Sequence, residues 1–131
     1  MNPVSFFLLR IGIGISMFGH GLVRLPKLRG FSAWMVGSFE KSMLPPALVV
    51  PFSYMLPLAE FIVGLFVLLG LFTRQAAIAG GALMLLLLFG TTMVENWEAL
   101  PSQLIHLAFF AVLIQFLPAN KWALDNALRR R

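Results

Sequence analysis

The sequence predicts an all-α integral membrane protein: an antiparallel four-helix bundle with an interfacial segment in its first loop. Of its 131 residues, 60% are hydrophobic and 11% are charged, whereas soluble domains average about 45–50% apolar and about 25% charged residues. Four apolar blocks, at 4–23, 51–72, 76–94 and 100–117, approach the roughly 20 residues that a helix needs to cross a bilayer. They use up most of the chain, so we expect a single transmembrane domain over 1–131 with a basic tail at 118–131.

Small residues in two of these blocks indicate close helix packing. Gly12, Ser16 and Gly19 share one stripe of the first block, and the third block opens with Ala76, Gly80 and Gly81. Small residues let transmembrane backbones approach one another. We therefore expect both sets to lie at helix–helix contacts.

The loops between the blocks differ in length and character. Between Arg24 and Pro46, aromatic residues and a methionine at helical spacing predict a short amphipathic segment over 31–39 that lies at the membrane interface, with a lid over a ligand as the alternative. The short link 71–75 forces an antiparallel hairpin, in which Thr73 is expected to cap the next helix. The third loop is acidic and leads to Pro101, which is expected at the start of the fourth helix.

The charge pattern points to lipid rather than to nucleic acid. The net charge is +5 and the isoelectric point is near 10.9, but the ten Lys and Arg residues are scattered among apolar blocks and form no continuous basic face. Anionic lipid headgroups are the expected partner. Five basic residues are expected on the side of the membrane that contains the termini and four on the opposite side. Because basic residues are more frequent on the cytoplasmic side, this count favours both termini in the cytoplasm.

The absence of cysteines limits the redox and metal chemistry that the chain can carry out. Without them the chain has no disulfide, no dithiol redox pair and no thiolate for a metal or an iron–sulfur cluster. Redox chemistry would therefore require a quinone or a cofactor held by a protein partner.

Polar residues inside the apolar blocks are the candidate functional residues, because a charge near the bilayer centre costs about 2.5–3.5 kcal/mol on insertion scales. A helical rise of about 1.5 Å per residue places His20 and His106 at similar levels, roughly 5 and 8 Å below the first-loop face. Glu60 follows at roughly 13 Å and Arg10 at roughly 20 Å. We expect Glu60 to pair with Arg10 or His20.

These residues favour a quinone site. Imidazole and carboxylate groups near one membrane face can hydrogen-bond a quinone carbonyl and transfer its proton, so His20, Glu60 and His106 are the candidate catalytic residues. Candidate ligand-binding residues are Arg10, Arg24 and Gln103. A haem held by both histidines, or a metal ion held by the histidines and Glu60, is a less favoured alternative.

Several motifs in order along the chain resemble the DoxX family. They are Leu9–Gly12, Gly19–Leu22 with Lys27, Glu60, Gly70–Arg74 and Trp122–Asp125. The resemblance implies a four-helix bacterial inner-membrane protein with both termini in the cytoplasm. Arg10, His20, Lys27, Glu60 and Arg74 match its recurring positions.

Two functions follow from the resemblance and the candidate site. The first is a membrane subunit of a redox complex that binds quinone or quinol, with protein partners and with homo-oligomerisation left open; the family name derives from a subunit associated with a thiosulfate:quinone oxidoreductase. The alternative is a non-catalytic membrane scaffold or chaperone that recruits soluble redox or sulfur-handling enzymes. Since a fold hosts many functions, the resemblance alone does not choose between them.

Overall fold

The computed structural model describes residues 1–131, which form helices and no strands. Four long helices are α1 (Pro3–Arg24), α3 (Pro46–Leu69), α4 (Thr73–Met93) and α5 (Leu100–Gln115). Shorter elements are α2 (Leu28–Ser38), α6 (Leu124–Arg129) and the 3₁₀ turns η1 (Leu25–Lys27) and η2 (Leu117–Ala119). The predicted all-α membrane fold is confirmed.

Three segments are long and apolar enough to cross a bilayer: Pro3–Ser38, which comprises α1, η1 and α2, then Pro46–Leu69 and Thr73–Met93. The fourth, α5, has 16 residues, which corresponds to about 24 Å of helix, less than the roughly 30 Å of a bilayer core. The chain is a membrane protein.

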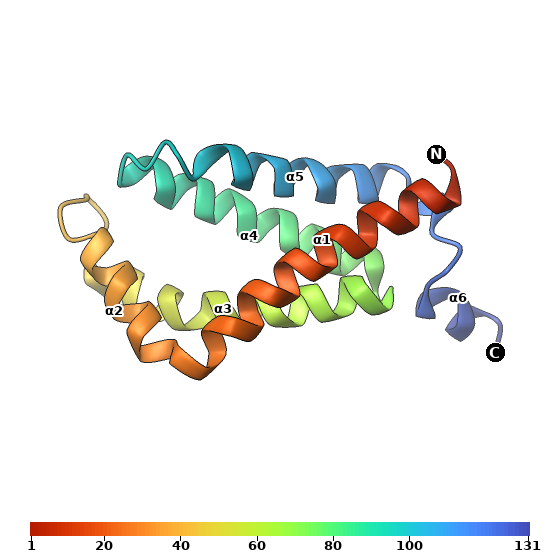
Figure 1. The fold of residues 1–131 in the computed structure, drawn as a ribbon, viewed down its shortest axis with the longest axis horizontal. Coiled ribbons are helices and arrows are strands. Elements are labelled where there is room, and N and C mark those ends of the chain that lie inside the picture. Colours follow the sequence, from red (N-terminus) through yellow and green to blue (C-terminus); the bar gives the residue numbers. More distant parts are fainter.

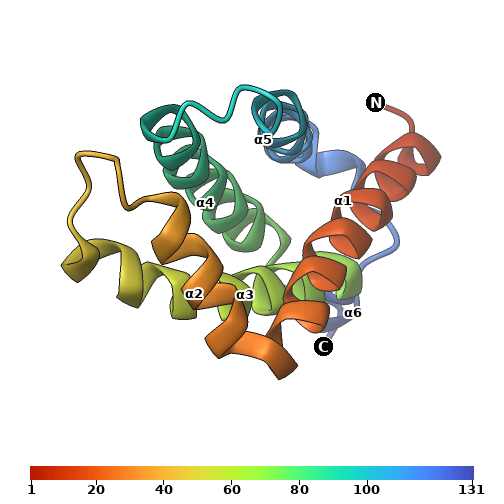
Figure 2. The ribbon, with the colours of Figure 1, turned by 60° about the vertical axis from the view of Figure 1, so that its left-hand side comes forward.

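The helices form two packed pairs. Packing is most extensive between α1 and α3, followed by α4 and α5 (Figure 1). Both termini and the α3–α4 hairpin lie at one end of the bundle, and α2 lies at the other end beside the first half of α3 (Figures 1 and 2). This α2 end contains the candidate site.

The contact between α1 and α3 depends on Gly21 and Gly64. A Cβ atom on either would come within 3.0 Å of the opposite backbone, at Phe61 and Phe18 respectively. Of the first stripe, only Ser16 lies at a helix–helix contact, with His106 on α5; the expectation is wrong for Gly12 and Gly19, because nothing lies within 4 Å of a Cβ built on either. Both of those glycines lie on the outer face of α1.

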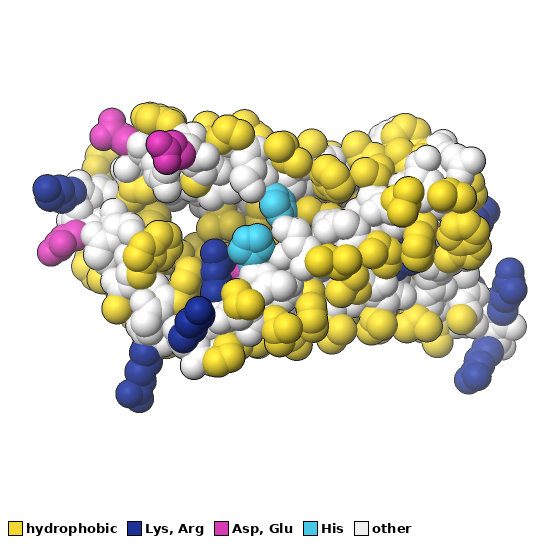
Figure 3. Space-filling model, viewed as in Figure 1, with side chains coloured by type: hydrophobic (Ala, Val, Ile, Leu, Met, Phe, Trp, Pro, Cys, Tyr) yellow, Lys and Arg dark blue, Asp and Glu magenta, His cyan; other side chains and the backbone are white.

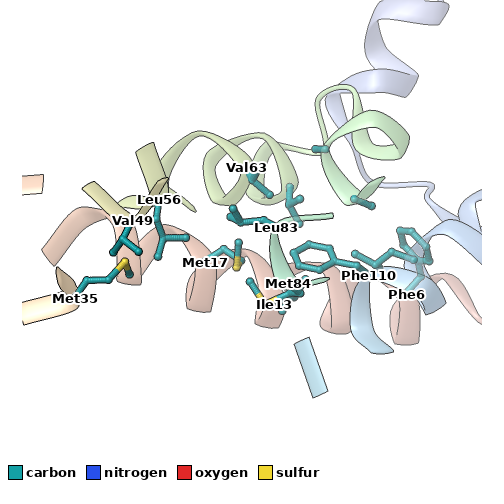
Figure 4. Packing of buried hydrophobic residues seen from close by; sticks show 14 residues of the cluster. Phe6, Ile13, Met17, Met35, Val49, Leu56, Val63, Leu83, Met84 and Phe110 are labelled. Atoms are coloured by element: carbon teal, nitrogen blue, oxygen red, sulfur yellow. The ribbon is translucent and has the colours of Figure 1, made fainter. Parts of the chain in front are cut away.

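Phe110 packs against Gly80, as expected for the third block, and the remaining core is aliphatic, aromatic and methionine-rich (Figure 4). Along this core, Phe6 and Phe110 lie toward one end, whereas Met35 and Val49 lie toward the other (Figure 4). Met17, Leu56 and Met84 are core residues that also line a cavity at the α2 end. The core therefore forms part of the wall of the candidate site.

The bounds of the second and third long helices differ from the expected 51–72 and 76–94. The second long helix begins at Pro46 rather than at residue 51, and Pro51 and Pro57 lie inside it. It ends at Leu69 and is followed by Gly70, whose φ of +66° is the left-handed conformation that suits glycine. Thr73 does not cap α4. Instead, the side chain of Asp125 in the tail accepts hydrogen bonds from the backbone N–H groups of Phe72 and Thr73, at 2.7 and 2.9 Å.

Candidate functional site

A cavity of about 290 Å³ lies at the α2 end of the bundle, with walls from all five of the helices α1 to α5. Its polar lining residues are His20, Arg24, Ser38, Glu60, Thr91, Asn96, Ser102, Gln103 and His106. Most of the other residues that line it are apolar, with Phe31, Trp34 and Phe39 contributed by α2 and its C-terminal end. The space-filling view shows a hollow at this end, with both histidine side chains beside it on the surface (Figure 3).

Glu60 on α3 pairs with Arg24 at the end of α1. Nη1 of Arg24 donates to both carboxylate oxygens at 2.9 Å. The Glu60 side chain is 4% exposed and that of Arg24 is 28% exposed, so the carboxylate is buried and the guanidinium reaches in from the edge. Arg24 also lies over the ring of Phe31, 4.7 Å from its centroid, which adds a cation–π contact.

The expectation that Glu60 pairs with Arg10 or His20 is therefore wrong. Helical side chains point back toward the N-terminus of their helix. Arg24 can for this reason reach down from the end of α1 to a carboxylate that is deeper in the bundle. Arg10 is 14 residues earlier, about 21 Å along the helix, which is too far away.

The two histidines meet across the α1–α5 contact. Their ring centroids are 6.2 Å apart, with the rings at 82°. Nδ1 of His20 is 2.6 Å from the carbonyl oxygen of Ser16, and Nδ1 of His106 is 2.7 Å from that of Ser102. A carbonyl oxygen can only accept, so Nδ1 carries the proton in both rings.

Ser16 determines which ring nitrogen remains free. Its hydroxyl is 2.7 Å from Nε2 of His106 and donates to that nitrogen when the imidazole is neutral. Nε2 of His20 has no hydrogen-bond partner in the protein. A haem between the two rings would require His106 to leave Ser16, and the histidines and Glu60 do not form a group that could hold a metal ion.

Gln103 lies one turn before His106 on α5 and also lines the cavity. Its Oε1 atom is buried and has no hydrogen-bond partner. Buried polar atoms in proteins are nearly always paired. The cavity wall thus contains a buried acceptor that no protein group satisfies.

The sequence profile of the DoxX family matches residues 5–94, more than half of the chain. The chain belongs to the DoxX family. The match covers α1 to α4 and so includes His20, Arg24 and Glu60, while Gln103 and His106 lie beyond it on α5. No curated protein and no solved structure shows significant similarity to this DoxX protein.

Arg10 is not at the site of this DoxX protein. Its guanidinium is buried at the opposite end of the bundle, where it donates to the carbonyl oxygens of Val67 and Leu68, both at 2.9 Å, and of Trp122. The carbonyl groups of Val67 and Leu68 are at the C-terminus of α3, where a cation is favoured. Arg10 therefore joins α1 to the hairpin and the tail, a structural role.

Sequence reasoning missed the contribution of Ser16 to the site. A small residue between two glycines indicates helix packing and gives no signal of a binding role. Trp34 and Met35, expected in an interfacial segment, line the cavity from α2. This placement favours the alternative in which the segment covers a ligand site.

Proposed function

We propose that this DoxX protein binds the ring of a quinone or quinol in the cavity and acts as the membrane subunit of a redox complex. The observation that carries the proposal is the lining of the cavity: a buried Glu60–Arg24 pair and the free Nε2 of His20 in otherwise mainly apolar walls. Small-molecule sites combine apolar walls with a few convergent polar groups in this way.

Size and position support the same ligand class. The volume of about 290 Å³ is at the lower end of ligand pockets, which suits one ring with its apolar tail outside. The hollow beside the histidines lies between α1, α2 and α5 (Figure 3). An isoprenoid tail could leave there into lipid.

The cavity residues have distinct expected roles. Arg24 retains N–H groups that can donate to a ring oxygen, while Nε2 of His20 can accept a proton from a ring hydroxyl. Glu60 holds Arg24 in place through two hydrogen bonds. A bound quinone would supply two-electron redox chemistry, and these residues would orient it and accept its protons.

A protein partner is part of the proposal. The chain contains no cysteine and only two histidines, so the electron donor or acceptor has to be another subunit. We place the protein in the bacterial inner membrane, with both termini in the cytoplasm. Cysteine-accessibility labelling next to Lys27, Arg74 and Glu98 tests this topology, which requires Arg74 on the side opposite to the other two.

Equilibrium binding of a short-chain benzoquinone to the purified protein in nanodiscs tests the function. We expect binding to the wild type and at least about tenfold weaker binding to His20→Ala and Glu60→Gln, corresponding to the loss of one charge-assisted or well-placed hydrogen bond. Glu98→Gln is the matched control, since Glu98 is exposed and outside the cavity. If the quinone does not bind, or if it binds equally to all variants, the quinone site is contradicted. The non-catalytic scaffold then remains as the function.

A further inference from the structure

We propose that the end of the bundle formed by the α3–α4 hairpin and the C-terminal tail binds the headgroup of an anionic phospholipid, with its phosphate held by Arg74 and Arg129. This site is separate from the quinone cavity, which lies at the α2 end. Three features of the hairpin end carry the proposal: the hydrogen bonds that fix the tail, the charge of this end, and the apolar side chains that the tail exposes.

The tail is held against the hairpin by hydrogen bonds. Besides accepting the backbone N–H groups of Phe72 and Thr73, Asp125 donates its own backbone N–H to the carbonyl oxygen of Gly70 at 2.9 Å. Nδ2 of Asn120 donates to the hydroxyl group of Thr73 at 3.1 Å. The tail consequently has a defined position beside the start of α4 (Figure 1).

This position brings two arginines from distant parts of the sequence to one groove of about 590 Å³. Arg74 lies in the first turn of α4, and Arg129 is the last residue of α6. Both are exposed, and neither lies within ion-pair distance of a carboxylate. Asp125 also lines the groove, but its carboxylate oxygens are already used by the backbone at the start of α4. The groove therefore offers two guanidinium groups, whose paired N–H donors suit phosphate oxygens.

The hairpin end is almost entirely basic. Its one acidic residue is Asp125, and its exposed basic residues are Arg74, Lys121, Arg129, Arg130 and Arg131. The α2 end differs, because acidic side chains accompany the basic ones there, whereas only basic side chains show at the hairpin end in the same view (Figure 3). Clusters of Lys and Arg at a membrane surface attract anionic headgroups. The charge of the hairpin end is complementary to such lipids.

Exposed apolar side chains of the tail favour a lipid over a soluble anion. The ring of Trp122 is edge-on to that of Phe7 near the start of α1, with the centroids 5.6 Å apart, and Trp122 is 54% exposed. Tryptophan is enriched at the level where a helix enters the membrane. Leu124 and Leu128, one turn apart on α6, are also exposed. These side chains can contact acyl chains while the arginines bind the headgroup.

The test measures the binding of a short-chain phosphatidylglycerol, labelled with a fluorophore on one acyl chain, to the purified protein in a neutral detergent by fluorescence anisotropy. We expect Arg74→Gln and Arg129→Gln each to weaken binding about fivefold, and the double variant to weaken it about 25-fold. Arg29→Gln is the matched control. It removes the same charge from an exposed site on α2, at the other end of the bundle, and should leave the affinity unchanged.

Asp125→Ala distinguishes a defined site from attraction by net charge. Removing a negative charge would by itself strengthen the binding of an anion. The substitution also removes the two hydrogen bonds that fix the tail, and with them the position of Arg129 relative to Arg74. We therefore expect weaker binding, in a variant that thermal unfolding shows to be folded. Tighter binding would overturn the site and leave only attraction by net charge.

Competition identifies the ligand. Unlabelled phosphatidylglycerol should displace the labelled lipid, whereas phosphatidylcholine of the same chain length and glycerol 3-phosphate should not. Equal displacement by phosphatidylcholine would overturn recognition of an anionic headgroup, and equal displacement by glycerol 3-phosphate would overturn a lipid as the ligand. If Arg29→Gln weakens binding as much as Arg74→Gln, the location of the site is wrong.

Discussion

The hydroxyl of Ser16 on α1 lies 2.7 Å from Nε2 of His106 on α5 and connects the two helices beside the cavity. The carbonyl oxygen of the same residue accepts a hydrogen bond from Nδ1–H of His20. One serine thus orients both histidines. Replacing its side chain affects His106 directly and leaves the carbonyl contact of His20 in place.

Ser16→Ala should therefore release His106 without releasing His20. The loss of one hydrogen bond should lower the free energy of unfolding by about 0.5–1.5 kcal/mol. Ser16→Thr, which retains the hydroxyl, serves as the control. The measurement is denaturant unfolding in detergent, together with the NMR signals of the two imidazole rings. Equal shifts of both ring signals would show that Ser16 does not act through its hydroxyl.

The Glu60–Arg24 pair should behave as a unit. Glu60→Gln alone leaves Arg24 without its carboxylate. We expect it to lower the free energy of unfolding by about 1–3 kcal/mol, less than the roughly 3–5 kcal/mol for a fully buried pair, because Arg24 is partly exposed. The double variant with Arg24→Gln should be less destabilised than the sum of the two single variants. Additive effects in this double-mutant cycle would mean that the two residues do not interact.

Glycines on the two faces of α1 should respond differently to alanine. Gly21→Ala places a Cβ against the backbone of Phe61 and should cost about 1–3 kcal/mol through helix displacement. Gly19→Ala, two residues earlier with open space around it, should be neutral or stabilise by up to about 1 kcal/mol. Thermal unfolding of both variants, measured side by side in one detergent, distinguishes the buried face from the outer face.

The free energy of unfolding should depend on pH through Asp125 in the C-terminal tail. Partial burial alone would raise the pKa of this carboxyl group, but the hydrogen bonds from Thr73 and Phe72 and the charge of Arg129 outweigh it, so its pKa is below the ordinary value. A lowered pKa contributes stability that is present above the unfolded value of about 3.9 and is lost as the pH falls through the folded value.

The wild type should accordingly be more stable than Asp125→Asn at pH 7, and the difference should shrink below about pH 4. Unfolding curves of both proteins from pH 7 to pH 3 measure it. Asn126→Ala, which changes a neighbouring contact but no charge, is the control. A constant difference across this range would show that the charge of Asp125 is not involved.

Composition and block length were sufficient to predict a membrane bundle, and the short link at 71–75 predicted the antiparallel hairpin. The approximate depths of His20, His106 and Glu60 also followed from the sequence, because helical rise fixes height along the bundle axis. The structure places all three around one cavity. The height of a residue along the bundle axis, however, does not determine the direction of its side chain.

Rotation of each helix about its own axis was decided only by the tertiary structure. In a soluble bundle the polar pattern marks the outer face, but lipid is as apolar as the protein interior, so an outer and an inner face of a transmembrane helix look alike in sequence. The assignment of Gly12 and Gly19 to a contact failed for this reason, whereas Gly21 makes one. The sequence by itself determined that Glu60 and Arg10 are inside the membrane protein; packing decided that Arg24 pairs with Glu60 and that Arg10 holds the hairpin.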